Sequence, residues 1–213
     1  MLSFLRRKKN SKIFCIGLNK TGTTSIESFF MENGYTVGDQ AKAEYLIEDW
    51  YKRDFKSTLE YCENYDAFQD VPFSLPYTFI FLEQHFPQAK FILTIRDSPE
   101  QWYSSLTAFH SKVLCNGTRI PNIQDLKSAT YRYEGYAYTT HKAMFNTPDE
   151  DLYNKEILIS YYENYVDSVQ DYFRSKPEKL LVINVAKDGD YSRLCKFLEK
   201  PCTETGLSWV NKT

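Results

Sequence analysis

The chain has 213 residues, of which 42% are hydrophobic, and a formal net charge of −2. This length is sufficient for one domain with a substantial core. The near-balanced charge argues against a protein that binds nucleic acid through broad positive potential. The apolar residues 1–5 are too few for a signal peptide or a membrane span. We therefore expect a soluble, cytoplasmic protein whose partners include neither nucleic acid nor membrane.

The chain divides into a short tail and one domain. Residues 6–9 are all basic, and we expect residues 1–11 to form a basic N-terminal tail. Residues 12–213 contain no internal repeat, low-complexity tract or linker, which predicts a single domain over that range. The five cysteines lack the spacing of metal ligands, so we expect no metal site.

The first predicted elements enclose a small loop rich in hydroxyl groups. An apolar run indicates a strand over 13–17, and a helix is predicted from about 23 to 32. A strand, a glycine loop and a helix in this order direct backbone N–H groups and the positive end of the helix dipole at one place. Lys20 adds a full positive charge inside the loop. The segment therefore predicts a phosphate-binding site.

Strands and helices alternate along the rest of the chain. The pattern predicts helices over about 41–64 (interrupted near 53–57), 74–85, 98–113, 124–145, 149–174 and 191–198, and strands over 66–70, 90–96 and 179–185. Strands separated by helices indicate a parallel sheet, so the predicted fold class is α/β.

A second candidate site residue follows the strand predicted over 90–96. Ser98-Pro99 has the form of a helix start, with a capping serine and a proline at the first helical position. Arg96 therefore lies at the carboxyl end of a strand, which is the edge where open α/β sheets bind ligands. Its guanidinium group suits a phosphate.

The type of phosphate loop can be read from the position of the lysine. Gly17 and Gly22 have the separation of the nucleotide-triphosphatase loop G-x-x-x-x-G-K-[ST], but Thr23 stands where that loop has its lysine. The order Lys20-Thr21-Gly22-Thr23-Thr24 instead resembles the K-[ST]-G-T-T loop of the sulfotransferases. These enzymes transfer a sulfonate from 3′-phosphoadenosine-5′-phosphosulfate (PAPS) to a hydroxyl or amine and release the bisphosphate PAP.

The resemblance implies a set of donor-binding residues. Family members bind the 5′-phosphosulfate with this loop, and they hold the 3′-phosphate with a strand-end arginine and a serine eight positions later. A basic residue near the C-terminal end can assist. The corresponding residues here are Lys20, Thr21, Gly22, Thr23, Thr24, Ser25, Arg96, Ser104 and Lys212.

Further segments are similar to a microbial branch of the family. They are Tyr65–Pro72 (YDAFQDVP), Phe86–Asp97 (FPQAKFILTIRD) and the tail Trp209–Lys212. The implied fold is a single α/β domain of the P-loop NTPase-like sulfotransferase type, with a parallel sheet flanked by helices. We expect residues 106–165, where the resemblance is weak, to form a helical cap over the acceptor.

The resemblance also suggests catalytic roles. Lys20 would stabilise charge that grows on the leaving phosphate, and no metal is required. The cytosolic branch has a histidine as base at the position of Asp70, so an aspartate there leaves the role open. Glu27 is the second candidate, because some branches use a glutamate. His110 and His141 could also reach the site from the cap.

The acceptor is a small molecule or a glycan that the sequence does not identify. Tyr131, Tyr133, Tyr136 and Tyr138 either line an acceptor pocket or pack the cap. Two other functions remain open. A small-molecule or nucleotide kinase would use Asp97 to bind a metal ion, and a non-catalytic protein would bind PAP without turnover.

Overall fold

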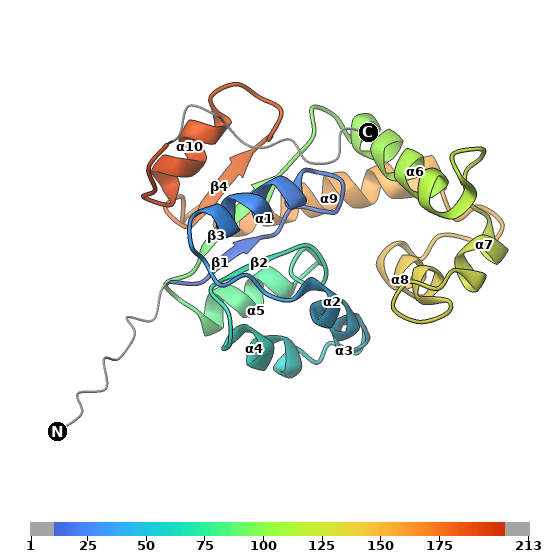
Figure 1. The fold of residues 1–213 in the computed structure, drawn as a ribbon, viewed down its shortest axis with the longest axis horizontal. Coiled ribbons are helices and arrows are strands. Elements are labelled where there is room, and N and C mark those ends of the chain that lie inside the picture. The colour runs from blue at the N-terminus through green and yellow to red at the C-terminus, as the bar shows by residue number, and fades with distance from the viewer. Residues whose placement is uncertain (1–10, 203–213) are drawn as a thin grey trace.

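The computed structural model describes residues 11–202 (Figure 1). Its centre is one sheet of four parallel strands in the order β2-β1-β3-β4. The strands are β1 (Ile13–Cys15), β2 (Ala67–Gln69), β3 (Lys90–Thr94) and β4 (Leu180–Ile183). The predicted α/β class and parallel sheet are confirmed. Most of the predicted basic tail, together with Trp209 and Lys212, lies outside the described residues.

Helices cover both faces of the sheet (Figure 1). The helices are α1 (Thr23–Glu32), α2 (Gln40–Ala43), the 3₁₀ turn η1 (Glu44–Leu46), α3 (Ile47–Tyr51), α4 (Lys56–Cys62), α5 (Thr78–His85), α6 (Pro99–Cys115), α7 (Ile123–Ser128), α8 (Tyr136–Phe145), α9 (Lys155–Phe173) and α10 (Asp190–Phe197). No helix within residues 11–202 is both long and apolar enough to cross a membrane.

Alternation along the strands divides the core into two layers. Ile13 and Cys15 of β1 pack in a cluster with the buried phenylalanines of α1, whereas Phe14 belongs to the cluster that includes residues of α5 and α9. Because β1 pairs in register with both neighbours, Phe14 lies beside Phe68 of β2 and Phe91 of β3. The ring centroids are 4.8 and 5.5 Å apart and the rings are stacked. Part of the high aromatic content is therefore used in the sheet core.

Helices α6, α7 and α8 stand apart from the sheet. Figure 1 shows α7 and α8 at one side of the molecule, next to α6. The single helix predicted over 124–145 is two helices here: the chain becomes extended at Ala129 after α7, and Gly135 takes a φ of 82° before α8. The helix predicted from 149 begins only at Lys155, where the Asn154 side chain accepts a hydrogen bond from the N–H of Ile157. The interruption predicted near 53–57 matches the break between α3 and α4.

A close contact between two strand ends fixes the position of the β1–α1 loop. Gly17 follows β1, and a Cβ atom on it would lie 1.9 Å from Thr94 Oγ1 and 2.6 Å from the Thr94 carbonyl oxygen. Since Thr94 ends β3, only a residue without a side chain lets the two strands leave the sheet this close together. The contact brings the segment after β1 next to the segment after β3.

Replacing Gly17 with Ala should therefore destabilise the protein. We expect Gly17→Ala to lose on the order of 2–3 kcal/mol of unfolding free energy, because backbone atoms of Thr94 would have to move. Gly38→Ala is the matched control, since its Cβ would meet only side-chain atoms, at 3.0 Å or more. Urea denaturation of the two variants measures the difference. Equal losses would show that the contact is not the constraint described.

Candidate functional site

The loop between β1 and α1 is held by donors from other elements. The carbonyl oxygen of Asn19 accepts a hydrogen bond of 3.0 Å from the indole N–H of Trp102 on α6. The carbonyl oxygen of Lys20 accepts one of 2.6 Å from Nε of Arg96, which follows β3. Two loop carbonyls that would repel an anion therefore already accept hydrogen bonds. The bond from Arg96 to the Lys20 carbonyl joins the two sequence motifs directly.

Thr21 stabilises the loop from its buried side, through contacts with Leu18 and Thr94. Its hydroxyl lies 2.5 Å from the carbonyl oxygen of Leu18 and 2.6 Å from the Thr94 hydroxyl, and the residue is fully buried. Its backbone N–H also donates to Leu18. Thr21 thus connects the loop to β3 and does not line the cavity described below. Its predicted contact with the 5′-phosphate stays a prediction.

Helix α1 begins directly after the loop and directs its N-terminus at the cavity. Gly22 precedes it with a φ of 105°, and a Cβ on Gly22 would lie 2.4 Å from Cγ2 of Val185. The N–H groups of Thr23 and Thr24 have no acceptor within the helix, because no helical residue precedes them. The first turn carries no acidic residue. These donors and the helix dipole favour an anion.

Two cations, Lys20 and Arg96, both line this part of the site. Neither Lys20 nor Arg96 forms an ion pair with an Asp or Glu among residues 11–202. Burial lowers the pKa of Lys20, and the nearby positive charge of Arg96 adds to the effect. Burial also lowers the pKa of Arg96. The Lys20 ammonium lies 4.0 Å from the ring centroid of Phe109, so the contact that partly compensates it is a cation–π contact.

A cavity of about 660 Å³ joins this anion site to the helices of the predicted cap. Its walls come from the β1–α1 loop, the end of β2, and helices α6, α7 and α8. Of the residues predicted for the site, the cavity is lined by Lys20, Gly22, Thr23, Thr24, Ser25, Asp70, Arg96, His110 and His141. The structure thus brings together segments that are far apart in the sequence.

Arg96 has a serine neighbour on α6, but it is not the expected one. Its Nη2 lies 3.5 Å from Oγ of Ser105, whereas Ser104 is exposed and is not part of the cavity wall. Consecutive residues of a helix point about 100° apart, so a count along the sequence does not determine which of two adjacent serines faces the strand. The role of Ser104 in binding the 3′-phosphate stays a prediction.

Asp70 lies at the end of β2 and faces the cavity. It adopts the left-handed conformation with a φ of 57°, and its Oδ1 accepts a hydrogen bond of 2.8 Å from the N–H of Val71. Burial raises its pKa from 3.8 to about 6, and the negative charges of Glu44 and Glu27 act in the same direction. A carboxylate with a pKa close to neutrality is suited to take a proton from a substrate.

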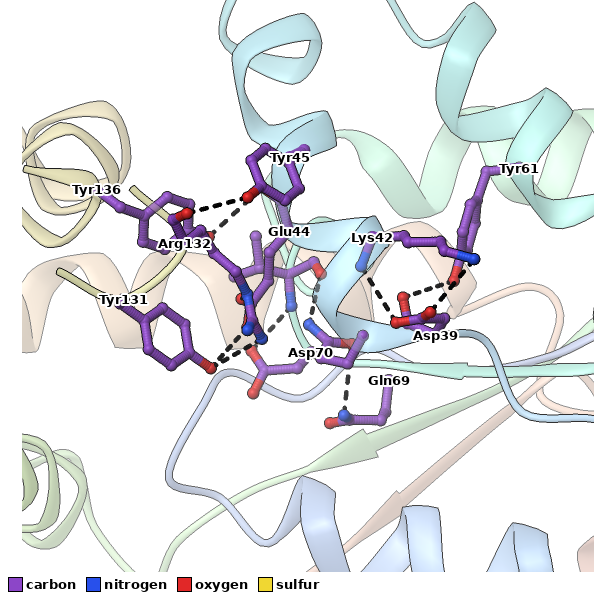
Figure 2. A network of polar contacts seen from close by, with 12 residues as sticks. Asp39, Lys42, Glu44, Tyr45, Tyr61, Gln69, Asp70, Tyr131, Arg132 and Tyr136 are labelled. Atoms are coloured by element: carbon purple, nitrogen blue, oxygen red, sulfur yellow. Dashed lines mark hydrogen bonds and ion pairs between the residues drawn. The ribbon is translucent and has the colours of Figure 1, made fainter. Parts of the chain in front are cut away.

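Glu44 belongs to a polar network that has no recognisable signal in the sequence (Figure 2). Nε of Arg132 donates to Oε2 of Glu44 at 2.5 Å, and its Nη2 donates to the Tyr131 hydroxyl at 3.0 Å. Tyr45 donates to the Arg132 carbonyl at 3.0 Å, and Tyr136 lies 3.4 Å from the Glu44 carbonyl. We call these five residues the clasp. It connects η1 to the segment between α7 and α8, whose residues are nearly 90 positions later.

Of the four tyrosines of the predicted cap, two line the cavity and two do not. Tyr131 and Tyr136 line the cavity. Tyr133 and Tyr138 do not, and their hydroxyl groups donate to Glu48 at 3.4 Å and to Asp149 at 3.1 Å. A tyrosine-rich run therefore provides both cavity wall and cap surface.

The two candidate histidines share one tyrosine neighbour. Nδ1 of His110 lies 2.8 Å from the Tyr153 hydroxyl, and Nε2 of His141 donates to the Leu152 carbonyl at 2.6 Å. Burial lowers the pKa of His110 to about 3 and that of His141 to about 4. Both are therefore neutral near pH 7, and both are much weaker bases than Asp70.

Glu27, the other candidate base, lies one turn into α1. It is half-buried, burial raises its pKa, and it is not part of the cavity wall. Its influence on the site is the negative charge that it adds to the surroundings of Asp70. Asp70 is thus the acidic candidate that faces the cavity.

Asp97, the residue that a kinase would need for a metal ion, is engaged elsewhere. Its Oδ1 lies 2.7 Å from Nζ of Lys187 and accepts a hydrogen bond of 3.0 Å from Nδ2 of Asn184. It does not line the cavity. Within residues 11–202 there is also no group of three or more His, Cys, Asp or Glu side chains that could hold a metal ion.

The raised pKa of Asp70 predicts a cost in stability. Asp70→Asn keeps the acceptor for Val71 and tolerates the positive φ, but it removes a partly desolvated charge. Because the folded pKa exceeds the unfolded one, the wild type loses stability as the pH rises from about 4 to about 6. We expect the variant to be more stable by about 3 kcal/mol at pH 7, and by no more than about 0.5 kcal/mol near pH 4.

Urea denaturation at both pH values tests this expectation. Asp188→Asn, which removes an exposed carboxylate, controls for the change in net charge. A stability difference that is the same at pH 4 and pH 7 would contradict a raised pKa of Asp70 in the folded protein.

A comparison with curated proteins found no match, whereas a protein-family model matches most of the chain. Residues 12–213 match the family model described as "Sulfotransferase domain". That match includes the β1–α1 loop, Arg96, the sheet and the helices of the predicted cap. Similarity to a microbial branch stays a prediction. The chain therefore belongs to the sulfotransferase domain family.

Proposed function

We propose that the protein transfers a sulfonate from PAPS to a hydroxyl or amine of a small-molecule or glycan acceptor. One observation carries the proposal. Lys20, Arg96 and the N-terminus of α1 converge on one cavity, which Asp70 also faces, and among the described residues neither cation forms an ion pair with a carboxylate. Two cations without ion-pair partners in a partly buried site favour a ligand with several negative charges.

The residues present fit such a donor. PAPS carries negative charge at its 5′-phosphosulfate and at its 3′-phosphate. Lys20 and the first turn of α1 would hold the former, and the fork-shaped guanidinium of Arg96 would hold the latter. Gly22 has no side chain, and Val185 occupies the space that one would need. Lys212 lies outside the described residues, and its contact with the 3′-phosphate stays a prediction.

The chemistry follows from the charges of the site. When bound, PAPS supplies a sulfonate that passes to the acceptor oxygen as the bond from sulfur to the 5′-phosphate breaks and PAP leaves. Lys20 stabilises the negative charge on that phosphate. Asp70 takes the proton of the acceptor hydroxyl, and its raised pKa is suited to this role near neutral pH. No metal ion is needed for these steps.

Ligand binding separates the roles of the two cations. We expect Arg96→Gln to weaken PAP binding about 10–100-fold, because a charge-assisted hydrogen bond to the 3′-phosphate is lost. Binding of adenosine 5′-phosphosulfate, which lacks that phosphate, should change little. Lys20→Met should weaken both ligands. Lys112→Met, which removes a neighbouring cation outside the cavity wall, is the control.

Calorimetric titration measures these affinities, with ATP and magnesium titrated in parallel. Equal losses for both ligands in Arg96→Gln would mean that the arginine acts only through the Lys20 carbonyl. Preference for ATP with magnesium would overturn the proposal in favour of a kinase. Tight PAP binding without turnover on any acceptor would indicate a protein that only binds PAP.

The pH dependence of turnover tests Asp70. If Asp70 is the base, kcat/KM should fall as the pH drops below about 6, because the carboxylate becomes protonated. Glu44→Gln removes a negative charge near Asp70, so the acidic limb should move to lower pH by ~0.5–1 unit. Glu48→Gln removes the same charge on α3 and should leave the limb in place. An unchanged limb in Glu44→Gln, or full activity in Asp70→Asn, would exclude this role for Asp70.

A further inference from the structure

Helix α9 contacts the ends of two strands through the hydroxyl groups of two tyrosines. Tyr162 and Tyr165 are three positions apart, so they lie on the same side of the helix. The Tyr165 hydroxyl donates to the carbonyl oxygen of Ile16, directly after β1, at 2.6 Å. The Tyr162 hydroxyl accepts a hydrogen bond of 2.9 Å from the backbone N–H of Arg96, which follows β3. One helix therefore holds both of the segments that supply the cations of the anion site.

The Tyr162 hydroxyl is an acceptor for an N–H group that has left the sheet. One position earlier, the N–H of Ile95 donates to the carbonyl oxygen of Ile183, at the end of β4. The N–H of Arg96 has no backbone acceptor among residues 11–202. Because the Tyr162 side chain is buried, water is a poor substitute for its hydroxyl. The backbone position of Arg96 therefore depends on this one side chain.

The ring of Tyr162 makes a second, separate contact. It stacks on the indole of Trp102, with ring centroids 5.0 Å apart and an interplanar angle of 29°. The Trp102 N–H in turn donates to the carbonyl oxygen of Asn19, next to Lys20. The ring thus supports the β1–α1 loop, whereas the hydroxyl supports Arg96. Replacing Tyr162 with phenylalanine removes the second support and keeps the ring that provides the first.

We propose, on the basis of the proposed function, that Tyr162 is a positioning residue for recognition of the 3′-phosphate of the donor. Its hydroxyl fixes the backbone of Arg96, and the bond from Nε to the Lys20 carbonyl fixes the side chain. A guanidinium that is held in advance loses less conformational freedom when it binds a phosphate. Arg96 lines the cavity and Tyr162 does not, so Tyr162 acts through Arg96 and not on the ligand itself.

The ratio of two affinities separates this role from a merely structural one. Loss of a structural hydrogen bond would weaken every ligand of the site to the same extent. Positioning of Arg96 concerns only a ligand that carries the 3′-phosphate. We expect Tyr162→Phe to weaken PAP binding about 5–10-fold and to leave the affinity for adenosine 5′-phosphosulfate within about twofold of the wild type.

Two further tyrosines of α9 provide matched controls. Tyr165→Phe removes a buried hydroxyl bond of the same kind, but from Ile16 at the start of the loop that both ligands share. It should therefore change both affinities by a similar factor. Tyr161→Phe removes a buried hydroxyl without a partner within residues 11–202, so it should change neither affinity. Calorimetric titration of the three variants measures the affinities, and urea denaturation measures their stabilities.

Amide hydrogen exchange tests the contact without any ligand. In Tyr162→Phe the N–H of Arg96 has lost its acceptor, so it should exchange about 10-fold faster than in the wild type or more. Tyr165→Phe leaves that bond intact and should have a smaller effect on this amide. NMR spectroscopy of the 15N-labelled protein measures the exchange rate of the single amide.

The outcomes distinguish this inference from the proposed function. Absence of PAP binding by the wild type would refute the donor assignment, and the exchange rate would then decide alone whether Tyr162 positions Arg96. A selective loss of PAP affinity in Tyr162→Phe, together with faster exchange of the Arg96 amide, supports the inference. Equal losses for the two ligands, an unchanged PAP affinity or an unchanged exchange rate in that variant overturns it.

Discussion

The close passage of Gly17 against Thr94 is the constraint on which the site depends. It places the ends of β1 and β3 side by side, so that Arg96 reaches the Lys20 carbonyl across 76 positions of sequence. Two cations are thereby held in one partly buried site, although their mutual repulsion and lost hydration disfavour this. The packing of the sheet supplies the free energy that holds them there, and an anionic ligand would reduce the repulsion.

Backbone strain accompanies a buried charge at two residues of the cavity wall. Lys20 and Asp70 are both non-glycine residues with a positive φ, at 66° and 57°, and both bear charges that burial disfavours. Backbone strain and desolvation of this kind concentrate at functional sites, where the surrounding structure compensates for them. Here that compensation comes from the aromatic sheet core and from the hydrogen bonds of Thr21 and Trp102.

Local patterns predicted the local parts of this structure. The strand–loop–helix segment, the Ser98 cap and the position of Arg96 after β3 each depend on residues close together in the chain, and the family match adds the fold around them. The clasp was missed because Glu44 and Arg132 are 88 positions apart and no local period connects them. The break before α8 depends on the backbone conformation of Gly135, and the choice between Ser104 and Ser105 depends on helix phase. Neither is determined by residue type alone.

The division of the cavity wall also bears on how such a protein can change its substrate. The segments that follow β1 and β3 supply Lys20 and Arg96, whereas much of the remaining cavity wall lies on α7, α8 and the last turns of α6. The clasp joins these helices to η1 through side-chain hydrogen bonds, two of which end on backbone carbonyls. Under the proposed function, recognition of the donor and recognition of the acceptor would therefore be encoded in largely separate stretches of the chain. Exchange of residues 113–145 would then be the most direct route to a new acceptor specificity.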